Sequence, residues 1–287
     1  MRNERKQMDN AKGGIFIATP AYGQLVHAEF CSSLVTTALS LRTAGYGVLW
    51  SSNALPSARF GRTEMAAQFL MLNERQKEPL NLTHILWVDA DIAWPLGAVE
   101  KLLAHDLPVV AGVYPRKEPR LAYPVIWSKT GDGKITVKGD SLVKARMVPG
   151  GFVLVKREVF TKLREAYPER SLSTVWQCRP WGPWAYDFYP EELHGDGTVD
   201  SEDFGFSRLW GDIGGEIWVD RTIGLTHYGS HGFYWDPEET LGASMREAEK
   251  EGIVVRQDEG SGTEDDLVRS KPKEDHGQEM EAEDIAA

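Results

Sequence analysis

The sequence predicts an α/β fold, a single domain built on a mixed, mainly parallel sheet flanked by helices. Short apolar runs alternate four times with segments of helical periodicity before residue 115, as in parallel strands joined by right-handed crossovers. Hydrophobic residues make up 41 % of the 287 residues, which allows a sizeable core. Residues 123–127 and 134–138 are expected to form a hairpin across the turn at 131–133, which would add antiparallel strands.

The first half of the chain supplies the four alternations. Apolar runs are bounded by turn residues, such as Pro20 and Gly23 after the first run. The segments between them carry apolar faces, such as Ala66, Phe69 and Leu70 in the second helix. The strands are expected at residues 14–18, 46–50, 84–88 and 109–114, and the helices at 29–43, 57–72 and 95–104.

The second half is less regular. Apolar runs predict strands at 148–155 and 216–219, with a further apolar stretch at 223–225. Helices are expected at 157–165, 201–210 and 236–250, the last opened by Asp236 and Pro237. Between them lies a loop rich in Trp, Pro and Tyr. We expect its aromatic side chains to form either a small core beneath the loop or a platform for sugar rings or bases: Trp176, Trp181, Trp184, Tyr186, Phe188 and Tyr189.

Charge is unevenly distributed along the chain, whose net charge is −11. Residues 256–287 hold 11 acidic and 4 basic residues and few large apolar ones, so we expect an acidic, disordered tail. Residues 1–12 are polar and are expected to form a disordered lead, which leaves a folded domain at 13–255. The folded part is mildly acidic, which argues against strong nonspecific binding of nucleic acid.

Cysteine content and hydropathy bear on location. The two cysteines, Cys31 and Cys178, form no disulfide framework and have no zinc-finger spacing. The N-terminus has no apolar signal segment, and no apolar run is long enough to cross a bilayer. We therefore expect reduced thiols and a cytoplasmic location, in the host cytoplasm if the protein is viral.

The functional prediction depends on residues 84–92. An apolar run without alternation is typical of a strand covered on both faces, and it ends in Asp89 and Asp91. Residues two apart on an extended chain point the same way, so two carboxylates would meet at the carboxyl end of a buried strand. Such a pair suits a divalent cation, manganese or magnesium, that carries substrate phosphates. The alternative is that these aspartates cap the next helix, near Pro95.

Acidic side chains also begin the helix expected at 201–210. Glu202 and Asp203 follow Ser201. They can stabilise the positive end of the helix with Ser201 as the cap, or one of them can accept a proton from an attacking hydroxyl. The two roles are compatible.

Other candidates lie at the ends of predicted elements. His227 could be the neutral third ligand of the ion, although a single His is more often a half-buried hydrogen-bonded residue. His231 and nearby glycines suit phosphate oxygens. Arg59 and Arg62, three apart, could form surface salt bridges or hold a diphosphate. Thr19, Pro20 and Tyr22 follow the first strand, a natural place for a nucleoside base or ribose.

Taken together, these segments resemble nucleotide-sugar glycosyltransferases of the GT-A fold, the broad superfamily that includes family 2 enzymes and the Anp1-like mannosyltransferases. The resemblance spans residues 14–235. It rests on Asp89-Ala90-Asp91 after an apolar strand, Pro149-Gly150-Gly151-Phe152 before a helix, Ser201-Glu202-Asp203, and His227.

The resemblance implies a role for each segment. Asp91 would bind the metal, Asp89 the ribose or metal, and His227 would complete the metal sphere. Asp203 would be the catalytic base and Glu202 would touch the acceptor. Residues 13–117 would form the nucleotide-binding half and 118–255 the acceptor-binding half. The donor would contact these residues: Thr19, Pro20, Tyr22, Arg59, Arg62, Asp89, Gly150, Gly151 and His231.

We therefore expect a metal-dependent, inverting hexosyltransferase that moves a sugar from a nucleoside-diphosphate donor, for example a UDP sugar, to an acceptor hydroxyl. The acceptor could be a glycan. One alternative is the same chemistry on a hydroxymethylated DNA base, as in phage DNA glycosyltransferases, with the aromatic loop holding a flipped base. Another is a module that binds nucleotide sugars without catalysis.

Overall fold

The structure is a computed structural model that describes residues 12–74, 81–118, 121–174, 176–195 and 197–257. Almost all of the expected N-terminal lead and nearly all of the expected acidic tail lie outside the described residues. The last described element, the strand β15 (Val254–Gln257), ends two residues beyond the expected domain boundary at 255.

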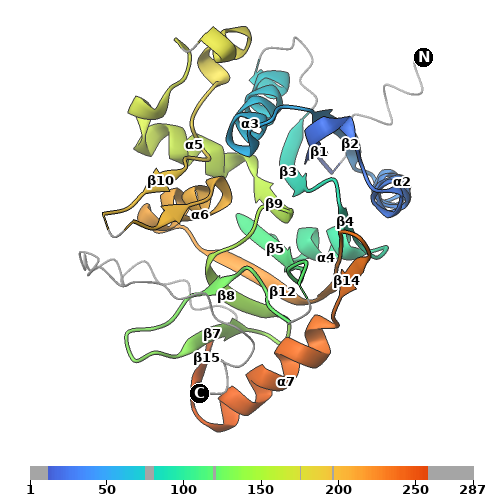
Figure 1. Cartoon of the computed structure of the whole chain (residues 1–287), viewed down its shortest axis with the longest axis vertical. Coiled ribbons are helices and arrows are strands. Elements are labelled where there is room, and N and C mark those ends of the chain that lie inside the picture. Colours follow the sequence, from blue (N-terminus) through green and yellow to red (C-terminus); the bar gives the residue numbers. More distant parts are fainter. Residues whose placement is uncertain (1–11, 75–80, 119–120, 175, 196, 258–287) are drawn as a thin grey trace.

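A ten-stranded sheet forms the centre of the molecule, with strand order β15-β7-β8-β12-β5-β9-β3-β1-β2 and β6 paired to β8 (Figure 1). Its strands are β1 (Gly14–Pro20), β2 (Gly47–Asn53), β3 (Leu82–Val88), β5 (Val109–Val113), β6 (Ile126–Trp127), β7 (Ile135–Lys138), β8 (Leu142–Met147), β9 (Phe152–Lys156), β12 (Ile217–Gly224) and β15.

Strand direction confirms the predicted mixed, mainly parallel sheet. Strands β1, β2, β3, β5 and β12 run in one direction, as the four alternations require. Only β8 and β9 of this sheet run against the rest in the described part of the chain. Strand β9 lies between β3 and β5 and runs antiparallel to both, so β3 and β5 do not pair with each other.

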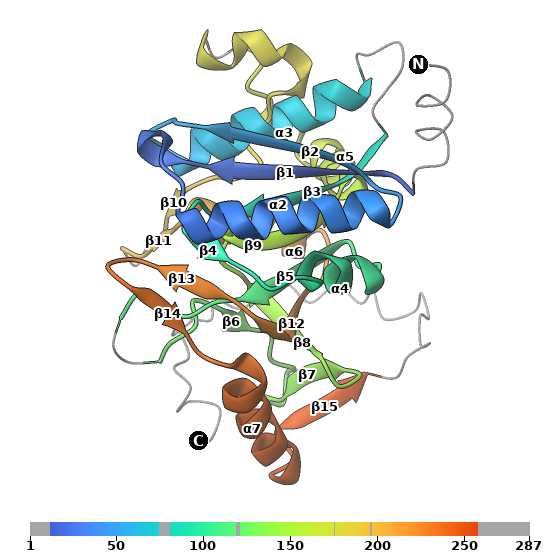
Figure 2. The ribbon, with the colours of Figure 1, turned by 90° about the vertical axis from the view of Figure 1, so that its right-hand side faces the viewer.

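Helices cover both faces of the sheet. Residues of α3 (Ala58–Glu74), α5 (Arg157–Ala166), α6 (Glu202–Asp212) and α7 (Pro237–Lys250) belong to one hydrophobic cluster. Residues of α2 (Ala28–Thr43) and α4 (Ala98–Ala104) belong to a second cluster on the other face, and these two helices lie in front of the sheet in Figure 2. Alternate residues of β1 divide between the clusters, with Phe16 in the first and Ile15 and Ile17 in the second.

Three local predictions were wrong. The strands of the expected hairpin at 123–138 do not pair with each other, because β6 and β7 both pair with β8. The turn between them does form, with the Lys129–Ile135 bridge and a 2.8 Å hydrogen bond from the Thr130 N–H to the Lys134 carbonyl. The strand expected from residue 148 begins at Phe152, which leaves 149–151 as a loop. The helix expected from Pro95 begins at Ala98 with Gly97 at its N-cap, so neither aspartate caps it.

A second, small sheet lies next to the end of β3. It consists of β4 (Ile92–Ala93), β13 (Thr226–Tyr228) and β14 (Gly232–Tyr234). The β4–β13 ladder pairs Ile92 with His227, so it carries the late histidine to the segment that follows Asp91.

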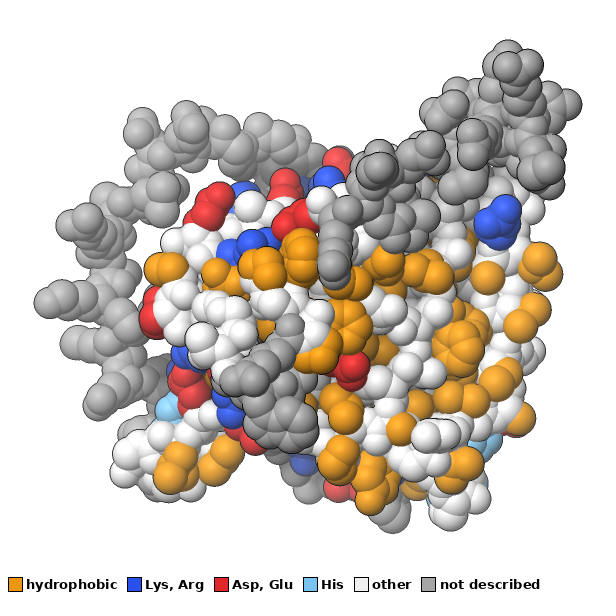
Figure 3. All heavy atoms as spheres, turned by 90° about the horizontal axis from the view of Figure 1, so that it is seen from above, with side chains coloured by type: hydrophobic (Ala, Val, Ile, Leu, Met, Phe, Trp, Pro, Cys, Tyr) orange, Lys and Arg blue, Asp and Glu red, His pale blue; other side chains and the backbone are white. Residues whose placement is uncertain are grey.

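The described helices include none that is both long and apolar enough to cross a membrane. Cys31 is exposed and Cys178 is buried, and both are free thiols. On the face shown in Figure 3, hydrophobic side chains spread across the middle and right of the view, while most charged side chains lie to the left.

Candidate active site

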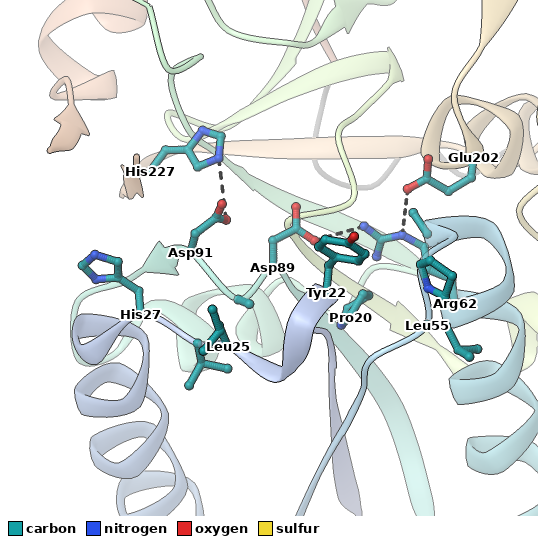
Figure 4. Close-up of a pocket in the computed structure, with 14 residues that line it drawn as sticks. Pro20, Tyr22, Leu25, His27, Leu55, Arg62, Asp89, Asp91, Glu202 and His227 are labelled. Carbon is teal, nitrogen blue, oxygen red and sulfur yellow. Dashed lines mark hydrogen bonds and ion pairs between the residues drawn. The ribbon is translucent and has the colours of Figure 1, made fainter. Parts of the chain in front are cut away.

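A pocket of about 520 Å³ opens where β1 and β3 end (Figure 4). One wall is apolar and comes from the segments after β1 and β2. The opposite wall is charged and comes from α3, the end of β3, the start of α6 and β13. The lining residues are Pro20, Tyr22, Leu25, Val26, His27, Leu55, Pro56, Ala58, Arg62, Asp89, Ala90, Asp91, Glu202 and His227.

Asp91 and His227 point toward each other on the charged wall of this pocket (Figure 4). His227 Nε2 lies 3.7 Å from Asp91 Oδ1. The other ring nitrogen, Nδ1, lies 3.0 Å from the carbonyl oxygen of Pro115, to which it donates, so Nε2 keeps its lone pair toward Asp91. Burial lowers the pKa of His227, against the opposing effects of the Pro115 carbonyl and Asp91. A neutral imidazole with a free Nε2 is the form that binds a metal.

Arg62 connects three segments of the site. Its guanidinium donates to Asp89 Oδ1 at 3.1 Å, to the Gly150 carbonyl at 3.2 Å and to Glu202 Oε1 at 3.2 Å. It also stacks on Trp87, with 5.2 Å from its central carbon to the ring centre. The residue is 3 % exposed. Burial opposes its charge, but the carboxylates around it hold the pKa of Arg62 above its ordinary value.

Asp89 turns toward Arg62. Burial raises the pKa of Asp89 to about 6; Arg62 opposes this rise, and the negative charges of Asp91, Asp203 and Glu202 add to it. One third of its side chain, 33 %, still reaches solvent, so the carboxylate remains open to the pocket.

The two acids at the start of α6 have different environments. Glu202 lines the pocket and its Oε1 accepts from Arg62. The carboxylate of Asp203 accepts from the backbone N–H of Gly150 at 3.0 Å and of Phe204 at 2.9 Å, and from the Ser201 hydroxyl. Asp203 therefore pins the 149–151 loop to α6, while Glu202 faces the cavity.

Gly150 and Gly151 allow close packing beneath the site. A Cβ on Gly150 would lie 2.5 Å from Arg62 Nη2, and one on Gly151 would lie 2.4 Å from Tyr114 Oη. Tyr114 Oη accepts from the Gly151 N–H at 3.1 Å, and burial keeps the pKa of Tyr114 well above its ordinary value. These glycines were predicted to contact the donor, but neither lines the pocket.

Three more residues predicted to bind the donor lie elsewhere. Arg59 is bound to Asp187 through two hydrogen bonds, of 3.0 and 2.7 Å. Thr19 is fully buried and accepts from Trp50 Nε1 at 3.1 Å. His231 is exposed in the β13–β14 turn and packs on Phe233 at 4.1 Å between ring centres. Pro20, Tyr22 and Arg62 do line the pocket.

The aromatic segment after α5 contributes mainly to packing. Its first part forms 3-10 turns, η3 (Trp176–Trp184), broken at Gly182. Phe188 and Tyr189 are 2 % exposed and belong to the core, with Trp184 and Tyr186 packed against it. These side chains thus extend the main core and do not form the separate small core that was one of the two expectations for the loop. The side chain of Trp176 lies outside the described residues.

Sequence reasoning missed two residues that shape the charged wall. Lys117 donates to Asp91 Oδ2, and the ring of Tyr114 packs edge-on against His227 at 5.0 Å. Both follow β5, which runs in the same direction as β3 and ends at the same edge of the sheet, and that position is the signal that could have drawn attention to them.

The fit of the predicted metal ligands is partial. Asp91 Oδ1 and His227 Nε2 converge, and both atoms are of kinds that bind manganese or magnesium with water and phosphate oxygens. Asp89 is engaged with Arg62 instead. Within the described ranges, no three His, Cys, Asp or Glu side chains gather closely enough to hold an ion by themselves. Two protein ligands and a phosphate-bearing ligand would have to complete the sphere.

Comparison with known protein families and with curated proteins gives no match to this chain.

Proposed function

We propose that the protein is a metal-dependent glycosyltransferase of the GT-A type, which transfers a sugar from a nucleoside-diphosphate donor to an acceptor hydroxyl. The observation that carries the proposal is the convergence of Asp91 and His227 at the end of a buried strand, with Asp89, Arg62 and Glu202 in the same pocket. Ligands of open α/β sheets bind at this position, beyond the carboxyl ends of the strands.

The chemistry of the two walls suits such a donor. The apolar wall, which includes Tyr22 and Leu55, offers an aromatic ring and aliphatic surface on which a nucleoside can pack. The charged wall offers Asp91 and His227 as ligands of a divalent ion, which, when bound, would stabilise the charge that develops on the leaving phosphate.

We propose Glu202 as the base. It faces the cavity, whereas three hydrogen bonds commit Asp203 to holding the 149–151 loop. The acceptor O–H would lose its proton to Glu202 as its oxygen bonds to the anomeric carbon, and the sugar–phosphate bond would break with its electron pair moving to the phosphate oxygen. This proposal moves the role of the base from Asp203, where the resemblance placed it, to Glu202.

Donor hydrolysis tests the proposal without knowledge of the acceptor. Purified protein with Mn²⁺ should release nucleoside diphosphate from one member of a panel of UDP, GDP and ADP sugars, and chelation should stop the release. Failure of every donor, together with no binding of any nucleoside diphosphate, would refute a transferase. Binding without hydrolysis would favour the non-catalytic module.

The roles of the two acids can be separated by kinetics. Glu202→Gln should lower kcat by about 10²- to 10⁴-fold while KM for the donor changes little, because only proton transfer is lost. Asp203→Asn should lower kcat less and also lower the melting temperature, because it weakens the contact to Gly150. If Asp203→Asn instead abolishes turnover without loss of stability, Asp203 is the base.

A further inference from the structure

Lys117 adds a positive charge to the charged wall of the pocket. Its ammonium donates to Asp91 Oδ2, while Asp91 Oδ1 faces His227. The two side chains of this ion pair are about one-third exposed, 35 % for Lys117 and 37 % for Asp91. Lys117 is therefore the counter-ion of the carboxylate that we assign to the metal.

The position of Lys117 is tied to that of His227. One segment, residues 114–117, packs the Tyr114 ring against the imidazole, accepts from Nδ1 through Pro115 and presents Lys117 to Asp91. The Lys117 stem passes over Gly229, where a Cβ would lie 3.3 Å from Lys117 Cδ. The ammonium is thus delivered by the same backbone that orients the proposed metal ligand, on a stem that still has rotational freedom.

The net charge of the charged wall favours binding of a divalent ion even with Lys117 present. Six acidic and basic side chains lie together: Asp89, Asp91, Glu202, Asp203, Arg62 and Lys117. Four carboxylates and two cations give this group a formal charge of −2. A divalent ion would neutralise it. An ion between Asp91 Oδ1 and His227 would lie close to the ammonium on Oδ2 of the same carboxylate, and two cations at such short range repel each other strongly.

Resting on the proposed function, we propose that Lys117 is an exchangeable counter-ion: it occupies Asp91 until the divalent ion arrives, and its ammonium then turns to the phosphates of the donor. The ion takes the Asp91 carboxylate, and repulsion moves the ammonium off it. An arriving diphosphate supplies the nearest new negative charge, and a lysine ammonium binds phosphate well as a point charge.

The proposal predicts effects of opposite sign for a single substitution. Lys117→Met removes the competitor at Asp91, so Mn²⁺ alone should bind about fivefold more tightly, the size of a partly exposed ion pair. The same variant lacks the cation for the phosphates, so UDP at saturating Mn²⁺ should bind about tenfold more weakly. A purely structural role of Lys117 would weaken both.

Isothermal titration calorimetry of the full chain tests this. Wild type, Lys117→Met, Lys117→Arg and the control Lys134→Met, in which an exposed pair with Asp132 is removed, are titrated with MnCl₂ alone and then with UDP, and with GDP in parallel, at saturating Mn²⁺. Lys117→Arg retains the charge and should remain within about threefold of wild type on both. Lys134→Met should match wild type.

Two outcomes would overturn the proposal and can be told apart. If wild type binds Mn²⁺ and a nucleoside diphosphate but Lys117→Met binds Mn²⁺ no more tightly, Lys117 is not the exchanging counter-ion and the proposed function stands. If wild type and Lys117→Met both bind neither Mn²⁺ nor either diphosphate, the metal site itself is wrong and both proposals fail.

Discussion

Two arginines on α3 show how neighbouring residues of one type acquire different roles. Arg62 is almost fully buried among Asp89, Gly150 and Glu202. Arg59 pairs with Asp187 and its side chain is 32 % exposed. Spacing along the helix could not separate them, because what buries Arg62 is the approach of the 149–151 loop and α6, segments about 90 and 140 residues away in the chain.

Arg62→Met should therefore lower the free energy of unfolding by about 3–5 kcal/mol, because it leaves buried acids without their cation. Arg59→Met should cost only about 1 kcal/mol, since its pair is partly solvated. In the Arg59→Met variant, Asp187 would still accept a hydrogen bond from Arg170, at 3.5 Å, and so would retain a cationic partner. Urea unfolding of both variants against wild type measures the difference. Equal losses would show that Arg62 does not organise the charged wall.

At the scale of elements, the 149–151 loop is the part of the site with the least tolerance for added atoms. Its backbone contacts Asp203, Arg62 and Tyr114 at once. The loop lies between β8 and β9, the two antiparallel strands, and so reaches the end of the sheet where β3 also finishes. Gly150 and Gly151 let the loop pack closely against Arg62 and Tyr114, where a Cβ would not fit.

Gly151→Ala should destabilise the protein by about 1–3 kcal/mol, because its Cβ would overlap Tyr114 and Asp89. Gly131→Ala is the matched control, since a Cβ there meets nothing within 4 Å. Melting temperatures of the two variants decide the matter: a Gly151→Ala protein as stable as the control would mean that the loop can move away from the site.

A second contact between elements should make stability depend on pH. Asp220 on β12 is 1 % exposed and accepts from His105, just after α4, at 2.8 Å. Burial raises the pKa of Asp220, but the hydrogen bonds from His105 and Thr222 outweigh it and hold this pKa below its ordinary value. The ionised form is thus favoured by folding, and its contribution is present above the unfolded pKa and lost as pH falls through the folded one.

Asp220→Asn should consequently be less stable than wild type at pH 7, by about 1.5–3 kcal/mol for a buried charged hydrogen bond. The difference should shrink as the pH falls below about 4, because the carboxylate of the unfolded chain then takes up a proton before that of the folded protein does. Urea unfolding at several pH values gives the curve. A difference that stays constant over this range would contradict the assignment.

The elements differ in how far the sequence could specify them. Strands β1, β2, β3 and β5 were predictable because each is a short apolar run bounded by turn residues, a local signal. The partners of β6 and β7 were not, because both pair with β8, a strand whose alternating Leu142–Met147 pattern was overlooked. The position of β9 between β3 and β5 likewise depends on contacts between segments far apart in the chain, so no local sequence pattern could predict it.

At the scale of the whole molecule, the site depends on two sheets meeting. The large sheet brings β1 and β3 to one end, and the small sheet brings β13 to β4, immediately after Asp91. The spacing of Asp89 and Asp91 predicted that their two carboxylates would lie together at the end of the strand. The structure shows instead that they diverge, Asp89 toward Arg62 and Asp91 toward His227 and Lys117. The direction of each aspartate side chain is set by its partners in the folded protein, and a single sequence does not show which residues these are.

The most direct test of the metal-linked donor site is a thermal-shift panel of UDP, GDP, ADP and CDP with and without Mn²⁺, run on wild type and on Asp91→Asn. A ligand at a hundred times its dissociation constant stabilises the folded state by about 2.7 kcal/mol, which raises the melting temperature measurably. We predict that one nucleotide raises the melting temperature of wild type only when Mn²⁺ is present, and that Asp91→Asn loses this response. An equal shift in the two proteins, or the same shift without the ion, would contradict the central role of Asp91 and His227.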